Sequence, residues 1–308
     1  MIDNYSEKFR IALINKDLTA IKSTPKADLH NHAALGGNST NFGLKPLKKY
    51  DGYKGMKNYI SQVIAPCTKT LLNYQKYIDA TLLQAIDDGI TYLETSIDFR
   101  FIEMFPDIDS AIIYLENLKN LHKNVCEIHF DLGISRGSFN EFEKACELLT
   151  MDIFSGIDLY GNENSRDVKL FEKLFLYAKS KNKICKAHIG EYGTAQDIYE
   201  AVRILNLDEI QHGINVISDP YITQKIRSLN IVFNVCITGN IKMGIVKDYF
   251  SHPIRKMFDS GLKVTLNTDD FLLFNQSISE EFLNLYLLKI FNDIELDAIR
   301  ILGLRRKR

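Results

Sequence analysis

The sequence has few cysteines, and they are not arranged in pairs. Five occur in 308 residues with no C-x-x-C pair among them: Cys67, Cys126, Cys146, Cys185 and Cys236. A zinc site built from cysteines needs closely spaced thiols and a disulfide framework needs paired ones, so the spacing argues against both. We expect reduced and mostly buried thiols, as in a cytosolic protein.

Long apolar runs and a dominant charge of one sign are also missing. No apolar run reaches the length of a membrane span, and residues 1–22 contain no signal-peptide core. The net charge is −1 and the pI is about 6.7, so no basic field favours nucleic acid. The basic residues Arg305–Arg308 are typical of a solvated helix end. We therefore expect a cytoplasmic protein that binds neither membranes nor nucleic acid.

The chain also lacks low-complexity stretches, short repeats and linkers rich in proline or glycine. We therefore expect one domain over residues 1–308, a length that single α/β barrels commonly reach. The chain contains short apolar runs, which are typical of strands that are buried on both faces of a parallel sheet. Eight such segments predict strands: Ala27–His32, Ile90–Ile97, Cys126–Gly133, Phe154–Leu159, Ile184–His188, Glu209–His212, Ile231–Cys236 and Lys263–Asn267.

Segments with apolar residues at helical spacing separate most of these strands. One follows Thr194, a candidate N-cap, and continues to Leu205. Strands that alternate with helices predict a parallel α/β fold, either a doubly wound open sheet or a closed barrel. The count of eight favours a (β/α)8 barrel of the TIM type, and the residues at the strand ends support this choice.

Histidines and acidic residues gather at the carboxyl ends of the predicted strands. They are His30 and His32, His188 and Glu191, His212, and Asp269 and Asp270. Residues two apart in a strand share a face, so His30 and His32 can point at one metal ion. In a barrel the carboxyl ends of the strands converge on one face, where active sites lie. The remaining histidines, His122, His129 and His252, fall outside this set, and we expect them to be structural.

Three imidazoles and a carboxylate form a ligand set that suits zinc, with water completing the shell. We expect one Zn²⁺ per chain, although cobalt and iron fit the same ligands. The metal would lower the pKa of a water and supply a hydroxide nucleophile. A second carboxyl group nearby can then donate a proton. The spacing thus predicts metal-assisted hydrolysis without naming the substrate.

Four of these motifs, in order, resemble those of adenosine deaminases. They are Pro25–His32 (PKADLHNH), His188–Glu191 (HIGE), Gln211–Gly213 (QHG) and Asn267–Asp270 (NTDD). The intervals between the later motifs also match, and the similarity runs from about Pro25 to the C-terminus. The resemblance implies a barrel that hydrolytically removes the 6-amino group of an adenine nucleoside or nucleotide.

The resemblance also implies a role for each matching position. The implied zinc ligands are His30, His32, His188 and Asp269. Glu191 would protonate the purine N1 as C6 becomes tetrahedral, and His212 would orient the hydroxide or act as a base. Asp270 would hydrogen-bond to N7, and the backbone N–H of Gly161 would donate to N3. Attack at C6 moves electron density onto N1, so a protonated Glu191 is the key acid.

The segment after the first strand departs from the family pattern. Family members place an aspartate for the ribose 5′-hydroxyl where this chain has Ala34. Loss of that carboxylate removes a charge that would repel a 5′-phosphate. Gly36, Gly37 and Asn38 could instead offer backbone N–H groups to an anion, and three lysines follow: Lys45, Lys48 and Lys49. These features predict a nucleotide substrate such as AMP or dAMP; the alternative is a flexible turn beside solvated lysines.

The lid and the reaction class leave further alternatives. The segment from about Leu35 to Leu72 is shorter than the family's helical lid, so we expect a short lid. An aminohydrolase of adenine or of a modified adenine nucleoside stays open, as does an inactive barrel that binds a ligand. Two-metal members of the wider superfamily usually carry a bridging lysine or glutamate at the end of the fourth strand. In this chain the fourth strand ends with Asp158–Tyr160, which contains no lysine, and this favours a single metal ion. The sequence contains no P-C-x-x-C motif, which excludes the cytidine-deaminase fold. It does not indicate an oligomeric state.

Overall fold

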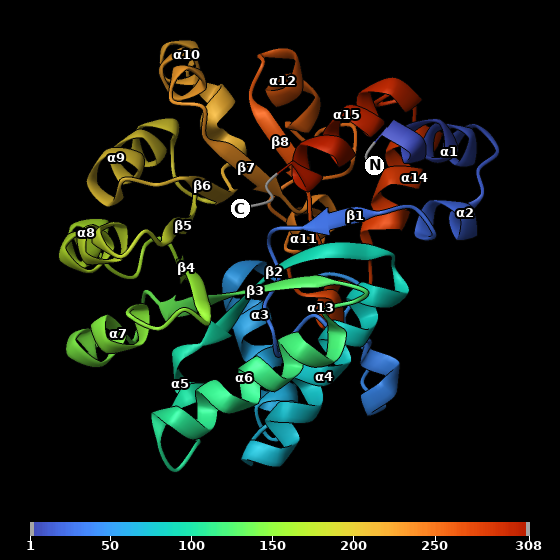
Figure 1. Ribbon diagram of the computed structural model, residues 1–308. Helices are drawn as coiled ribbons and strands as arrows, with labels where there is room; N and C mark the ends of the chain where they lie inside the picture. The colour runs from blue at the N-terminus through green and yellow to red at the C-terminus, as the bar shows by residue number, and fades with distance from the viewer. Residues whose placement is uncertain (1–2, 306–308) are drawn as a thin grey trace.

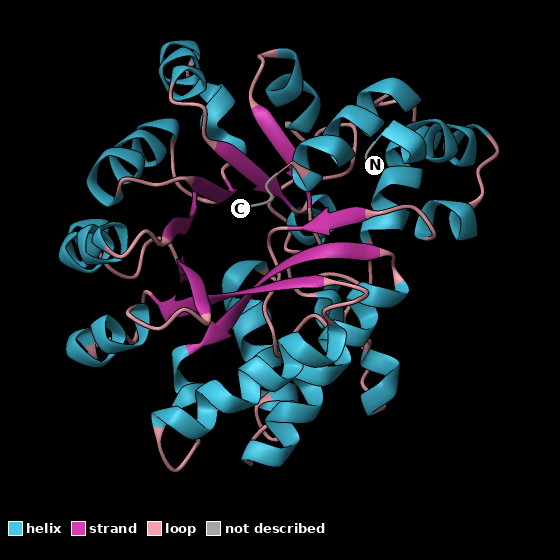
Figure 2. Cartoon of the chain, in the orientation of Figure 1, coloured by secondary structure: helices cyan, strands magenta, loops and turns pink. Residues whose placement is uncertain are grey.

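The computed structural model describes residues 3–305, so only Arg305 of the basic C-terminal segment lies within it. Its centre is one sheet of eight parallel strands that pair in chain order. The strands are β1 (Lys26–Asp28), β2 (Ile90–Asp98), β3 (Glu127–Ser135), β4 (Phe154–Tyr160), β5 (Ile184–Ile189), β6 (Glu209–His212), β7 (Val232–Val235) and β8 (Lys263–Leu266). Figure 2 shows the strands inside a ring of helices, and Figure 1 gives their order. The predicted (β/α)8 barrel is confirmed.

The first and last strands meet just beyond their ends, so the sheet is a nearly closed barrel. The Asp269 backbone N–H donates to the His30 carbonyl at 2.9 Å. The Leu29 N–H donates to the side-chain oxygen of Asn267 at 2.8 Å. These two contacts join the segments that follow β1 and β8, which places the first and fourth predicted motifs side by side.

Helices follow the strands and cover the outside of the barrel. The α-helices are α1 (Asp3–Ile14), α2 (Leu18–Lys22), α3 (Gly52–Tyr59), α4 (Leu71–Asp87), α5 (Phe99–Ile102), α6 (Ile108–His122), α7 (Phe142–Leu149), α8 (Glu172–Ser180), α9 (Ala195–Leu205), α10 (Pro220–Ser228), α11 (Ile237–Lys242), α12 (Ile254–Asp259), α13 (Phe271–Phe274), α14 (Ile278–Leu287) and α15 (Asp293–Leu304). Thr194 caps α9 in a capping box with Asp197, which confirms the predicted N-cap. Among the described residues, no helix is long and apolar enough to cross a membrane.

The barrel wall is apolar toward the helices and charged toward its axis. Along β3, Phe130 and Leu132 are fully buried, whereas Asp131 between them contacts the buried Lys186 of β5 at 2.6 Å. Lys186 also pairs with Glu94 and lies 3.8 Å from Glu209. Burying an ammonium group requires this kind of compensation by carboxylates. The strands are buried on both sides as expected, but the inner side is an ion cluster rather than an apolar layer.

The first strand is shorter than predicted, and both of its histidines lie beyond it. The chain leaves β1 after Asp28, whose carboxylate accepts hydrogen bonds from the His30 N–H at 3.3 Å and the Thr268 hydroxyl at 2.5 Å. His32 instead forms an isolated bridge with Ser96 of β2. The shared direction of the two imidazoles therefore comes from local turns and this bridge, not from alternation along a strand.

The segment between β1 and α4 forms the predicted short lid. It contains α3, a 3-10 turn η1 (Ser39–Phe42) and a π-helical turn η2 (Ile60–Ile64). Its side chains pack with Tyr77 of α4 and with Phe274 of α13 in a separate apolar cluster. The lid thus lies over the face of the barrel where β8 ends.

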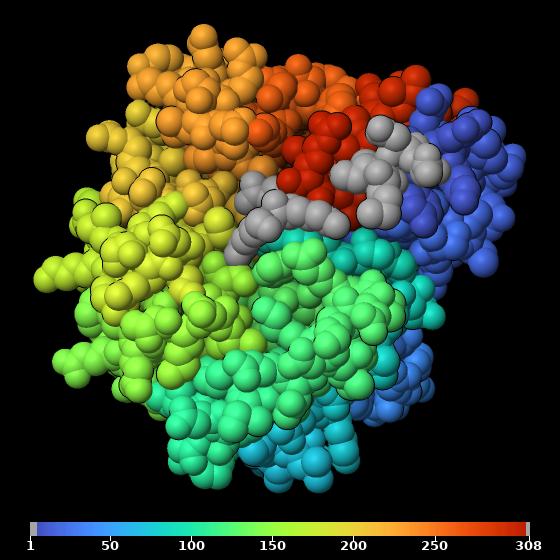
Figure 3. Space-filling view, in the orientation of Figure 1, coloured from blue at the N-terminus to red at the C-terminus, as the bar shows by residue number. Residues whose placement is uncertain are grey.

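The two ends of the described chain lie side by side on the barrel (Figure 3). Arg10 of α1 forms an ion pair of 2.6 Å with Asp293 at the start of α15. Arg300 of α15 donates to the carbonyl of Pro25, directly before β1, at 2.9 Å. Segments at opposite ends of the sequence therefore brace the first strand together.

Candidate metal centre and active site

A cavity opens at the carboxyl ends of the strands. Its empty volume, including space open to solvent, is about 800 Å³. Residues from the strand ends form its floor, among them the predicted His32, His188, Glu191, His212, Asp269 and Asp270. Tyr53, Met56 and Ile60 of the lid line the opposite side. One cavity thus collects most of the residues that the sequence predicts for the site.

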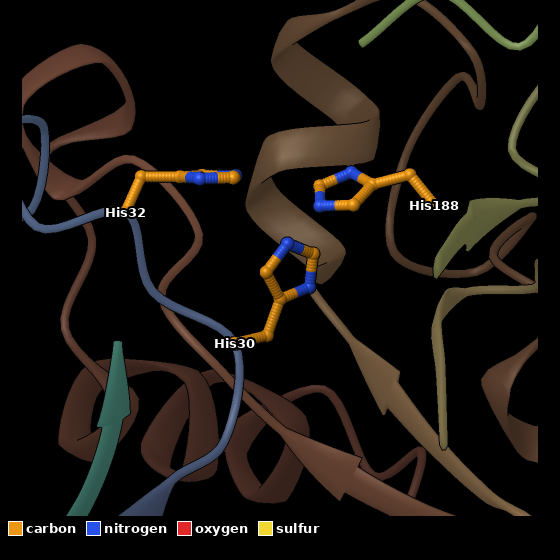
Figure 4. A group of neighbouring side chains, drawn as sticks. All are labelled: His30, His32 and His188. Atoms are coloured by element: carbon orange, nitrogen blue, oxygen red, sulfur yellow. The ribbon is translucent and has the colours of Figure 1, made fainter. Parts of the chain in front are cut away.

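Three of the predicted metal ligands converge on one point (Figure 4). The donor atoms of His30, His32 and His188 lie within 4.8 Å of one another. The Nε2 atoms of His30 and His188 are buried and have no hydrogen-bond partner among the described residues. Buried polar atoms are normally satisfied, so two orphaned imidazole nitrogens aimed at one point fit a metal ion.

The fourth predicted ligand, Asp269, completes this group. Its Oδ1 lies 3.4 Å from His32 Nε2 and 3.5 Å from His30 Nε2. Asp269 and His212 both adopt the left-handed backbone conformation, with φ of 57° and 64°. This conformation costs about 1 kcal/mol or more for a residue with a Cβ and is concentrated at functional sites.

The environment keeps two of the imidazoles neutral. Burial, followed by the neighbouring imidazoles of His188 and His212, lowers the pKa of His30 well below its usual value. Burial also lowers the pKa of His212 to about 3, although Asp269 acts in the opposite direction. A neutral imidazole is the form that binds a metal or accepts a proton.

Glu191 lies beside the histidines as a mostly buried carboxyl group. Burial and then the charges of Asp269 and Glu163 raise its pKa well above the usual value. The side-chain amide of Asn240 donates to its Oε1 at 3.0 Å, and His212 Nδ1 lies 3.8 Å from the same oxygen. A carboxyl group whose pKa is raised in this way is suited to donate a proton.

Behind Glu191, a chain of hydrogen bonds fixes the orientation of Asn240. His252 Nδ1 accepts from the Ile254 N–H at 3.1 Å, so its Nε2 carries the proton. That Nε2 donates to Asn240 Oδ1 at 3.2 Å, which turns the Asn240 amide nitrogen toward Glu191. His252, which the sequence analysis left outside the site, is thus linked to Glu191 through Asn240.

Glu163 is a site residue that the sequence reasoning missed. Its carboxylate accepts hydrogen bonds from four consecutive backbone N–H groups, of Gly190, Glu191, Tyr192 and Gly193, at 2.7–3.1 Å. The buried Arg136 in turn donates to the Glu163 carbonyl at 2.6 Å. Glu163 comes two residues after Gly161, but nothing local in the sequence links it to the loop after β5.

Cys236 is a second buried group that the sequence reasoning did not place at the site. Its Sγ lies 3.3 Å from His30 Nδ1, and it forms a possible ligand group with His30 and His212. Burial raises the pKa of its thiol well above the usual value. A neutral thiol is a poor metal ligand, and the Cys236 group does not include the orphaned Nε2 atom of His188.

Asp270 and Gly161 also line the cavity, and an Asp270 carboxylate oxygen lies within 4.8 Å of the donor atoms of His32 and Asp269. Burial and the charge of Asp269 raise the pKa of Asp270 well above its usual value. Its Oδ1 is buried without a hydrogen-bond partner among the described residues. Gly161 has φ of 104°, and a Cβ there would lie 3.6 Å from the Tyr53 hydroxyl. Both positions are compatible with contacts to a planar ligand.

The structure does not bring Gly36, Gly37 or Asn38 to this cavity. A Cβ on Gly36 would lie 2.5 Å from Thr81, and one on Gly37 would lie 2.9 Å from Ala80, so both glycines allow close packing on α4. Asn38 uses its side chain to cap the turn η1 through the Thr40 N–H at 3.0 Å. The prediction that these residues bind an anion therefore gains no support from their position.

A parallel eight-stranded barrel with clustered histidines and acids at its carboxyl end defines a metal-dependent amidohydrolase. The family profile described as adenosine deaminase matches residues 126–306. The Treponema pallidum protein assigned as an adenosine/adenine deaminase is 32% identical over 298 residues, covering 92% of this chain and 98% of the relative. The chain belongs to the adenosine deaminase family and carries out deamination of the adenosine/adenine deaminase type.

Solved structures with low sequence identity have the same fold. An adenine deaminase from Arthrobacter aurescens matches with a TM-score of 0.76 at 21% identity, over 91% of this chain and 93% of that one. An amidohydrolase from Burkholderia ambifaria with bound Zn matches with a TM-score of 0.74 at 19% identity, over 94% and 87%. At identities this low, the structural matches establish only the barrel fold. The substrate of this chain therefore has to be argued from its own cavity.

Proposed function

We propose that this protein converts adenosine and water to inosine and ammonia in a zinc-dependent reaction. One observation carries the proposal: the candidate metal ligands and a buried carboxylic acid share one cavity. Hydrolysis at C6 of adenine requires an activated water on the carbon and a proton donor at N1. The histidine cluster and Glu191 meet these two requirements on neighbouring walls.

The donor set fits zinc better than it fits metals that prefer an all-oxygen coordination shell, such as magnesium or calcium. His30, His32, His188 and Asp269 offer three nitrogens and one carboxylate, a tetrahedral combination that zinc accepts. Zinc bound there would act as a Lewis acid that lowers the pKa of a bound water. The remaining steps depend on side chains of this chain.

Glu191 donates its proton to N1, since its pKa is raised by burial and by the nearby carboxylates. Asn240 holds one Glu191 oxygen, which leaves the other free to face the base. His212, 3.8 Å from Glu191 and 3.9 Å from Asp269, is placed between them to orient the attacking water. Asp270 has a raised pKa, so its carboxyl group can donate a hydrogen bond to N7, which is an acceptor.

The described lining of the cavity favours a nucleoside over a nucleotide, because it offers no lysine or arginine to a 5′-phosphate. Among the described residues that line it, Asp98, Glu191, Asp269 and Asp270 are acidic and none is a lysine or arginine. Recognition of a phosphate normally uses cationic side chains or clustered backbone N–H groups. AMP and dAMP are therefore expected to be poorer substrates than adenosine, in contrast to the interpretation of the glycine-rich turn from sequence.

Free adenine is the second candidate. The side chain of Ala34 offers no acceptor for a ribose hydroxyl, and it belongs to the same apolar cluster as Leu35, Met56 and Phe274, which also line the cavity. A site for the free base needs no ribose contacts. Direct comparison of adenine with adenosine separates the two candidates.

The proposal is tested by following the loss of adenine absorbance with zinc-loaded protein. Adenosine, deoxyadenosine, adenine, AMP and dAMP are compared as separate substrates. We expect adenosine turnover, and a loss of about 10²- to 10⁴-fold in kcat for Glu191→Gln with unchanged zinc content. Glu200→Gln, an exposed position on α9, is the matched control. A zinc-loaded protein that converts none of these compounds contradicts the proposal.

A further inference from the structure

One carboxylate in the cavity has no place in the reaction described so far. Asp98 is the last residue of β2 and lines the cavity together with Ala34 and Tyr160. Its Oδ1 accepts from the Arg100 backbone N–H at 2.8 Å, and its Oδ2 accepts from the Tyr160 hydroxyl at 2.5 Å. A carboxylate offers about four acceptor positions, so each oxygen of Asp98 can accept one more hydrogen bond.

The shape of the purine indicates what Asp98 would meet. N9 lies across the ring system from C6 and N1, between the N3 and N7 edges. With C6 at the metal ligands, a substituent on N9 points away from them, past the residues near N3 and N7. Tyr160 directly precedes Gly161, the residue assigned to N3, and its ring lies 5.4 Å from that of His32. Tyr160 and Asp98 form a hydrogen-bonded polar corner of the cavity, which would lie beside the N9 substituent of a base bound in this way.

The neighbouring surface leaves Asp98 as the charged group at this end of the cavity. Glu191, Asp269 and Asp270 are assigned to the base and the metal, and the lid contributes apolar side chains such as Met56 and Ile60. The nearby Arg100 does not line the cavity, because its guanidinium donates to the Ser138 hydroxyl at 3.0 Å. Among the described residues, no lysine or arginine lines the cavity beside Asp98.

We propose that Asp98 determines substrate specificity by accepting a hydrogen bond from a ribose hydroxyl and by repelling a 5′-phosphate. Asp98, at the end of β2, would thus accept the ribose hydrogen bond that the side chain of Ala34 cannot accept. The inference rests on the proposed function, since it assumes an adenine base bound with C6 at the metal ligands. It assigns the site to neutral nucleosides, in preference to the free base and to nucleotides.

Asp98→Asn is the sharpest test, because it removes the charge and little else. Asparagine caps helices as well as aspartate does, so its oxygen keeps the Arg100 contact and its amide group faces Tyr160. One acceptor position on that oxygen then remains for ribose, and it no longer belongs to a charged group. We expect kcat/KM for adenosine to fall about ten- to a hundredfold, with kcat/KM for adenine unchanged and the preference for adenosine over AMP reduced.

Two further variants and a binding measurement keep the test specific. Asp107→Asn makes the same change at the N-cap of α6, outside the cavity, and should leave all substrates unchanged. Tyr160→Phe removes a hydrogen-bond donor but retains the charge, so it should preserve the preference for adenosine over AMP. Calorimetry with inosine and hypoxanthine measures ribose recognition without turnover. Asp98→Asn should weaken the binding of inosine and leave the binding of hypoxanthine unchanged.

The outcomes distinguish this inference from the proposed function. A wild type that deaminates adenosine and loses nothing in Asp98→Asn overturns the role of Asp98 only. An equal fall for adenosine and adenine also overturns it, since the residue would then be structural. If the wild type converts no adenine compound, the proposed function fails, and inosine binding that is unaffected by Asp98→Asn overturns this inference separately.

Discussion

The carboxylate of Glu163 shows how much of the site depends on a single side chain. Glu163 follows β4, and its carboxylate accepts hydrogen bonds from four backbone N–H groups around Glu191, in the loop that follows β5. Charge-assisted hydrogen bonds of this kind are shorter and stronger than neutral ones. Glu163 therefore positions the proposed proton donor, although it does not line the cavity.

We expect Glu163→Gln to lower kcat for adenosine about ten- to a hundredfold, with KM changed less than threefold. The amide has one acceptor oxygen and turns its NH₂ group toward backbone donors, so the loop shifts and Glu191 is misplaced. Steady-state kinetics and zinc content check this result. A variant that retains full kcat, or one that loses its zinc, would show that Glu163 does not act through Glu191.

At the scale of the element, the connection from α4 to β2 depends on one glycine. Gly89 has φ of 75°, and a Cβ there would lie 1.8 Å from the backbone oxygen of Lys22. Its own carbonyl accepts from the Lys26 N–H at 3.1 Å, so the turn is tied to the start of β1. The backbone of Lys22 leaves no room for a Cβ at this position.

Gly89→Ala is expected to destabilise the protein by about 2 kcal/mol or more, from the left-handed backbone and the overlap together. Gly43→Ala is the matched control, since Gly43 also has a positive φ of 65° but nothing lies within 4 Å of its Cβ position. It should cost only about 1 kcal/mol. Chemical denaturation measures both, and equal losses would contradict the steric argument.

Lys26, in the short strand β1, makes stability depend on pH. Burial lowers its pKa from 10.5 to about 8, although Asp88 acts in the opposite direction. Between pH 8 and 10.5 the unfolded chain binds more protons at this group than the folded chain, so the stabilising contribution appears as pH rises and is lost as pH falls through about 8.

We expect the stability difference between wild type and Lys26→Met to shift in favour of wild type from pH 8 to 10.5. The shift is at most about 3 kcal/mol. Urea unfolding at several pH values measures it, with each pair compared at the same pH so that other titrations cancel. A difference that stays constant over this range would rule out a lowered pKa for Lys26.

At the scale of the whole molecule, the barrel and the metal centre are built from separate parts. The eight strands pair along their lengths, while the candidate ligands lie at or beyond the strand ends. The apolar cores lie between the strands and their covering helices. Folding of the barrel should therefore not require the metal, unlike folding of small zinc domains.

Removal of zinc by a chelator is expected to abolish activity while far-UV circular dichroism stays unchanged. The melting temperature should fall by roughly 5 °C, since a ligand that binds the folded state at a hundred- to a thousandfold excess over Kd contributes about 3–4 kcal/mol. Added zinc should restore both activity and melting temperature. Loss of secondary structure on chelation would show that the metal organises the barrel itself.

The sequence alone determined the barrel and the chemistry at its carboxyl end. Short apolar strands, helical spacing and the Thr194 cap are local signals, and the fold is confirmed by the strand order. His30, His32, His188 and Asp269 follow strands whose ends must converge in a barrel, so they could be grouped without coordinates. Their roles as zinc ligands stay predictions that the geometry supports.

Only the tertiary structure decided which further residues support the site. Glu163, His252 and Asp98 reach the cavity or its acid through contacts between segments far apart in the chain. The glycine-rich turn after β1, which sequence reasoning assigned to a phosphate, packs on α4 instead. Periodicity and short motifs report local geometry and burial, whereas a hydrogen bond between two loops depends on the path of both, and that path is fixed only when the barrel closes.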